Sequence, residues 1–193
     1  LTMRGTIALY TFTTYSKKFL VNSGGFGKPE ATLVSAASLF IYMLLQPLVG
    51  ALSDRVGRRA VLIGFGALGT AGFYPILGEL AGATTVVQAF AWVMVGLAIT
   101  SGYTAVNAVV KAELFPAHIR ALGVGLPYAI AVAVFGGSTE FLALWSKRIG
   151  HESYFFAYVA GCAAVSLLVY ATMRDTKRHS SIDRDQAMPG NPR

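Results

Sequence analysis

The chain has 193 residues, of which 54% are hydrophobic and only 13% are charged. Soluble domains carry about 25% charged residues, so this chain could not cover a globular surface with polar groups, and we expect its partner to be a lipid bilayer. The net charge of +7 would also suit nucleic acid. However, the basic residues lie in short segments between apolar runs, which argues against that partner.

The lone Cys162 excludes a disulfide or a Cys-x-x-Cys metal site. No cluster of metal ligands and no pair of nucleophile and base indicates a metal, a cofactor or an enzyme.

Long apolar runs follow one another along the chain. No side chain is charged between Thr32 and Leu52, or between Leu80 and Val110. About 20 helical residues cross a hydrocarbon core of about 30 Å. The runs lack the strict alternation of barrel strands, so we expect helices. The sequence therefore predicts an all-α integral membrane bundle of about six transmembrane helices, at 1–21, 31–52, 60–80, 84–110, 121–145 and 154–173.

Residues 1–173 are predicted to form one transmembrane unit, and the polar segment 174–193 a disordered tail. The chain begins inside an apolar run without a signal-peptide pattern, so we expect it to be a piece of a longer protein. Lys and Arg are in excess in cytoplasmic loops. They are more frequent in the links near 53–59 and 111–120 and in the tail than in the links that carry Lys28 and Lys147. We therefore expect a cytoplasmic C-terminus and a multi-pass protein of the cell inner (plasma) membrane.

The link between the second and third runs has the sharpest pattern in the chain. It reads Gly50-Ala-Leu-Ser-Asp54-Arg55-Val-Gly57-Arg58-Arg59. Gly57 can adopt backbone angles that other residues resist. The Asp54 carboxylate can reach a helix N-terminus, where the dipole favours an anion. The pattern predicts a tight cytoplasmic turn, and a basic loop with an accidental acid is the alternative.

A second motif occupies the link between the fourth and fifth runs, where Glu113, Pro116 and Arg120 precede Gly123. The third and fourth runs are joined on the opposite side of the membrane, so both motifs lie on the same side. We therefore expect Glu113 to pair with one of the three arginines of the first motif. Independent solvation of these charges is the alternative.

Together these two motifs resemble the loop motifs of the major facilitator superfamily, and the chain is most similar to its metabolite:proton symporter branch. Further stretches carry the resemblance at 10–15, 46–54, 120–126 and 135–140. The resemblance implies the C-terminal half of a twelve-helix symporter. Its partners would be a missing N-terminal six-helix half, a small organic anion and a proton. The residues for which it implies a cytoplasmic gating role are Gly50, Asp54, Arg55, Gly57, Arg58, Arg59, Glu113 and Arg120.

For the substrate, the resemblance implies 2-oxoglutarate or a related dicarboxylate. Other carboxylates and zwitterions such as proline and betaine are the alternatives within transporters. A membrane fragment that does not transport is the alternative from another class.

Polar side chains inside the apolar runs are candidates for contact with a substrate. A guanidinium in an apolar run is costly, and Arg4 could bind a carboxylate through two hydrogen bonds. Snorkelling, or a chance position near the chain start, is the alternative for Arg4. Other polar residues recur at helical spacing and suit a hydrated cavity, although polar contacts between helices are equally consistent with them. The candidates are Arg4, Tyr15, Tyr42, Gln46, Tyr103 and Asn107.

Glu140 is the one acid well inside an apolar run. It is a candidate for proton coupling, because an intramembrane carboxylate is a functional hypothesis by default. It could instead be hydrogen-bonded structural support beside Gly136 and Gly137, or lie near the outer end of its helix.

Overall fold

The structure is a computed structural model that describes residues 2–115 and 119–172, without the side chains of Arg4, Leu114 and Arg120. The tail predicted over 174–193 lies outside these residues.

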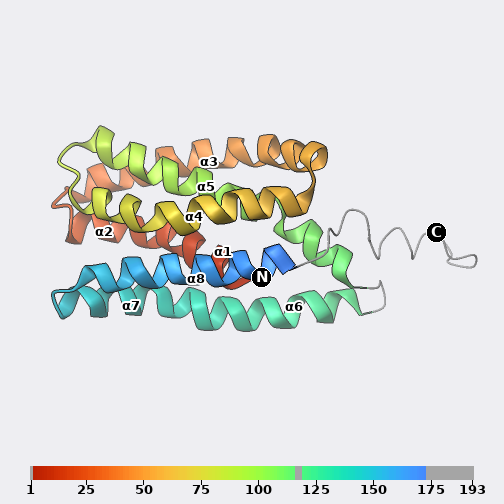
Figure 1. Ribbon diagram of the computed structural model, residues 1–193. Helices are drawn as coiled ribbons and strands as arrows, with labels where there is room; N and C mark the ends of the chain where they lie inside the picture. The colour runs from red at the N-terminus through yellow and green to blue at the C-terminus, as the bar shows by residue number, and fades with distance from the viewer. Residues whose placement is uncertain (1, 116–118, 173–193) are drawn as a thin grey trace, which may run out of the picture.

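The described residues form long helices that run side by side in alternating directions (Figure 1). Two rods of the bundle are interrupted by a π-helical turn. The first rod consists of α1 (Thr2–Tyr10), η1 (Thr11–Tyr15) and α2 (Ser16–Asn22). The fifth rod consists of α6 (Arg120–Ala131), η2 (Val132–Gly136) and α7 (Gly137–Arg148). The uninterrupted helices are α3 (Lys28–Val56), α4 (Arg58–Ala81), α5 (Val86–Leu114) and α8 (Glu152–Thr172).

The predicted class, an all-α membrane bundle, agrees with this structure. Five helices of the described chain are long and apolar enough to span a membrane, at Lys28–Val56, Arg58–Ala81, Val86–Glu113, Ala121–Arg148 and Glu152–Thr172. The first rod is not among them, so the predicted number of six is not established. This rod is the most polar, with three basic residues among many threonines and tyrosines.

The apolar runs marked the helices but not their ends. We expected the second run to end at Leu52, yet α3 continues to Val56 and ends at Gly57, where φ is 105°. This expectation was wrong because a helix continues into the polar region beyond the hydrocarbon core, where charged side chains are tolerated. The start of α3 is similarly earlier than predicted, and the Glu30 carboxylate accepts a hydrogen bond of 2.9 Å from the Gly27 N–H.

The two ends of the bundle carry different links. The α3–α4 link, the start of α6 and the end of α8 lie at one end, which we call the motif end (Figure 1). The α2–α3, α4–α5 and α7–α8 links lie at the opposite end. Arg59 donates to the Ala171 carbonyl at the motif end, whereas Lys147 donates to the Asn22 carbonyl at the opposite end. The predicted separation of Arg59 from Lys147 is confirmed.

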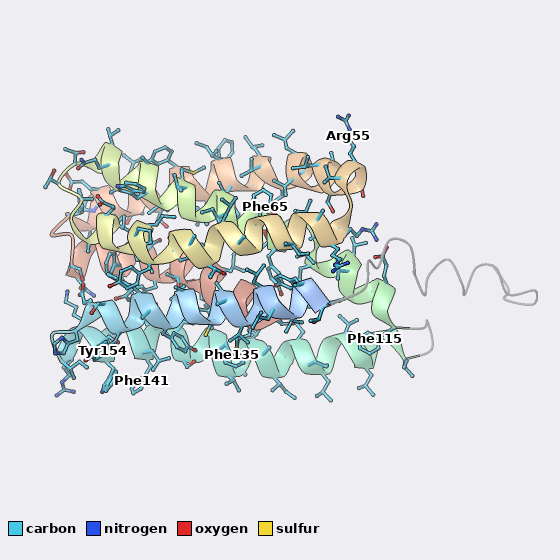
Figure 2. All side chains as sticks on the ribbon, viewed as in Figure 1. Arg55, Phe65, Phe115, Phe135, Phe141 and Tyr154 are labelled. Carbon is cyan, nitrogen blue, oxygen red and sulfur yellow. The ribbon has the colours of Figure 1, made fainter. Side chains whose placement is uncertain are left out.

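Aromatic contacts hold the first rod against its neighbours. The ring of Phe12 lies 5.4 Å from that of Phe73 on α4, and the Tyr15 ring lies 5.3 Å from that of Phe155 on α8. In contrast, large apolar side chains point outward from α3 and the fifth rod, as Figure 2 shows for Phe141. Such apolar outer faces are expected of a bundle in lipid.

Helix α5 packs closely against α4 at Gly102. A Cβ atom at this glycine would lie 2.2 Å from Cγ and 2.4 Å from Cβ of Phe65. Because the Phe65 Cβ is fixed by the α4 backbone, we expect Gly102→Ala to lower the free energy of unfolding by about 1–3 kcal/mol. The measurement is the unfolding midpoint in mixed micelles. Gly64→Ala is the control, because its Cβ would have nothing within 4 Å. An equal loss in both variants would contradict the close contact.

Candidate functional site

A cavity of about 200 Å³ lies between the first rod, α5 and the fifth rod. Five of its nine lining residues carry a hydroxyl group and one carries an amide, and no charged side chain of the described residues lines it. The lining residues are Gly5, Thr6, Leu9, Tyr10, Tyr103, Thr104, Asn107, Tyr128 and Val132. We call this space the central cavity. A neutral polar lining of this kind can hydrogen-bond a polar solute.

Two of the predicted substrate contacts line the central cavity. Tyr103 is buried, and its ring lies directly over Gly5, where a Cβ would meet the ring at 1.8 Å. Asn107 lies one helical turn further along α5, and its Oδ1 is buried without a hydrogen-bond partner among the described residues. Helix α5 therefore presents both side chains to the same space.

Tyr42 and Gln46 connect to the central cavity only through Thr104. The Tyr42 hydroxyl lies 2.6 Å from Thr104 Oγ1. The Thr104 hydroxyl in turn donates to Gln46 Oε1 at 2.9 Å. Gln46 Nε2 also donates to the Tyr42 carbonyl at 3.1 Å. These bonds join α3 to α5, which favours the alternative of polar contacts between helices for this pair.

Tyr15 and Glu140 line a second cavity, of about 150 Å³, which also includes Tyr10. The Glu140 carboxylate pairs with the Lys18 ammonium of α2, and the two side chains are 39% and 50% exposed. The acid that we considered for proton coupling thus has a cationic partner. The structure does not bring the six predicted contacts into one cavity. The side chain of Arg4 lies outside the described residues.

Lys111 is a residue that sequence reasoning misplaced. We assigned it to a cytoplasmic link, but it lies within α5 with only 7% of its surface exposed. Its Nζ is 4.2 Å from the centre of the Tyr128 ring and has no hydrogen-bond partner among the described residues. A buried ammonium loses several kcal/mol of hydration, whereas a desolvated cation–π contact contributes about 2 kcal/mol. The ring alone does not offset the burial. The signal in the sequence was the helical spacing of Tyr103, Asn107 and Lys111.

The motif end contains the expected ion pair. Arg58 pairs with Glu113, and their side chains are 16% and 6% exposed. The next residue, Arg59, donates from Nη2 to the Ala171 carbonyl at 2.6 Å, near the end of α8. The first turn of α4 is therefore connected to both α5 and α8.

Four other motif residues belong to α3 or directly follow it. Gly50 lies within α3, and Gly57 provides the positive φ that separates α3 from α4. Asp54 and Arg55 are exposed in the last turns of α3, and Arg55 points away from the bundle (Figure 2). The side chain of Arg120 lies outside the described residues.

A third space, an open groove of about 530 Å³, follows the outer face of the first rod. Lys17, Lys18 and Lys28 line it together with Thr13 and Thr14. These ammonium groups gather toward the end of the bundle opposite the motif, and they give the groove a positive potential that attracts anions.

Comparisons with known proteins agree with this arrangement. Residues 5–188 match the model of the Major Facilitator Superfamily. The chain is 49% identical over 168 residues to the alpha-ketoglutarate permease of Escherichia coli, which covers 87% of this chain and 39% of that protein. It is 34% identical over 173 residues to the citrate-proton symporter of Klebsiella pneumoniae, covering 83% of this chain and 37% of the relative.

A proline/betaine transporter of Escherichia coli is 29% identical over 175 residues, which covers 88% of this chain and 34% of that protein. The chain thus spans less than half the length of these relatives. No solved structure matches the chain. The helical bundle, the two loop motifs and the match over most of the sequence lead to one conclusion: the chain belongs to the Major Facilitator Superfamily.

Proposed function

We propose that this chain is the C-terminal six-helix half of a proton-coupled symporter for 2-oxoglutarate or a related dicarboxylate in the cell inner membrane. The observation that carries the proposal is the 49% identity to the alpha-ketoglutarate permease over 168 residues. The likeness to a citrate-proton symporter supports an organic anion as the substrate and a proton as the coupling ion.

The structure supports this function through the position of its polar groups. The central cavity lies between helices, where transporters of this type bind their substrates near the middle of the membrane. The groove that Lys17, Lys18 and Lys28 line would raise the local concentration of anions at one end. Rocking of this half against an N-terminal half would then expose the cavity to each side in turn. The excess of Lys and Arg supports a cytoplasmic position for the motif end.

A zwitterion such as proline or betaine is the second candidate substrate. The likeness to a proline/betaine transporter over 88% of the chain favours it. A zwitterion has no net charge, so the lysine-lined groove would not concentrate it. The two substrate classes are therefore separable by competition.

The test is a chimaera in which this chain replaces the matching segment of the Escherichia coli permease. In cells without that permease, we expect uptake of radiolabelled 2-oxoglutarate that an uncoupler abolishes and that excess unlabelled 2-oxoglutarate inhibits. Excess proline should not inhibit uptake. Inhibition by proline with little effect of dicarboxylates would support the zwitterion. A chimaera that reaches the membrane but transports neither solute would support a fragment without transport activity.

The ion pair between Arg58 and Glu113 should control the change between conformations in the same chimaera. A hydrogen bond between charged groups contributes about 1.5–3 kcal/mol, so Glu113→Gln should shift the balance of conformations by about tenfold or more. We expect the maximal uptake rate to change while KM for 2-oxoglutarate stays near its original value. Glu79→Gln is the control, because Glu79 is exposed near the opposite end of α4. If both variants keep the original rate, the charges at the motif end set orientation only.

A further inference from the structure

We propose that the ammonium group of Lys111 binds a carboxylate of the transported anion at the edge of the central cavity nearest the motif end. The inference rests on the proposed transport of an organic anion and names the cation that would select it. The substrate contacts predicted from the sequence do not include this residue.

The first observation is the environment of Lys111 Nζ. The atom is buried and makes no hydrogen bond to any described residue. No carboxylate of the described residues lies within 4.0 Å of it, because the one acid close in sequence, Glu113, pairs with Arg58. Buried charges in proteins are paired with an opposite charge. The environment of Lys111 therefore suits an anion that is not part of this chain.

The second observation is the position of Lys111 relative to the cavity. Its Nζ lies 4.2 Å from the centre of the Tyr128 ring, and Tyr128 lines the central cavity. The Tyr128 side chain is 43% exposed, so the ring has space to rotate. Rotation would bring Nζ into direct contact with a carboxylate in the cavity.

The third observation is the row of polar groups on α5. Tyr103, Asn107 and Lys111 follow one another at intervals of four residues, so they lie on one face of the helix. They offer a hydroxyl, an amide and an ammonium in sequence along the cavity wall. A dicarboxylate can use all three, with one carboxylate on Lys111 and the remaining polar atoms on Asn107 and Tyr103.

The same geometry explains a preference for anions over zwitterions. A zwitterion would bring its own cation close to the Lys111 ammonium in a medium of low dielectric constant, where repulsion is strong. A dianion brings no cation to this site and meets no such penalty. Lys111 is thus a residue that determines specificity.

The experiment measures binding of radiolabelled 2-oxoglutarate and citrate to the purified 193-residue chain in lipid nanodiscs. We expect Lys111→Gln to weaken the binding of 2-oxoglutarate by about tenfold or more, as loss of a charge-assisted hydrogen bond does. Lys111→Arg keeps the charge and should retain most of the affinity. Arg148→Gln removes an exposed cation at the opposite end of the bundle and should leave the affinity unchanged. Circular dichroism checks that each variant keeps its helix content.

The outcomes separate this inference from the proposed function. Equal affinities of the original chain and Lys111→Gln for both anions would overturn the carboxylate site. Absence of binding by a folded chain would overturn it too, while uptake by the chimaera still decides the function independently. Binding of citrate alone, with the same dependence on Lys111, would uphold the site and refute 2-oxoglutarate as the substrate.

Discussion

The hydrocarbon core of a membrane offers no hydrogen-bond partners, and this constraint determines most of what the structure contains. Every peptide group in the core must form its hydrogen bonds within the chain, and an α-helix satisfies them all within one segment. Several side-chain hydroxyls bond to the backbone of their own helix, which meets the same constraint. Ser16 donates to the Phe12 carbonyl at 2.7 Å, and Thr100 donates to the Gly96 carbonyl at 2.8 Å. Several buried polar atoms of the described residues have no such partner, and at Lys111 the unpartnered group is an ammonium, for which burial costs the most.

The α3–α4 link and the first turn of α4 combine two tasks. Their arginines contribute to the excess of positive charge at this end of the bundle, which favours a cytoplasmic position for it. The same arginines connect three helices, because Arg58 pairs with Glu113 of α5 and Arg59 bonds to the Ala171 carbonyl of α8. Gly57, with its φ of 105°, allows the chain to reverse between α3 and α4 within a single residue. A motif of this length can therefore hold the motif end together and still be released as a unit.

The sequence could predict the class of fold and the sides of the bundle, because charge-free runs and basic links have a direct physical cause in the bilayer. It could not predict where helices end, since α3 remains helical through the charged residues up to Val56. The residues of the candidate site were harder to predict from the sequence than the fold. Helical spacing placed Asn107 correctly beside Tyr103, but the same spacing could not tell that Tyr42 and Gln46 bond to Thr104. Lys111 was misplaced because a basic residue near a link resembles a loop charge, and only packing against Tyr128 reveals its burial.

The π-helical turns carry a consequence for any residue-by-residue alignment of membrane helices. A π turn accommodates one more residue than an α turn, and each residue of an α-helix rotates its side chain by about 100° around the axis. The face that Thr6 and Tyr10 present before η1 is thus out of phase with the face that Lys18 presents after it. A relative in which this helix is continuous and one residue shorter would therefore point corresponding side chains at the same neighbours on both flanks. A single-residue gap that no π turn compensates would instead rotate every later side chain by about 100°, and so redirect a polar stripe without a substitution.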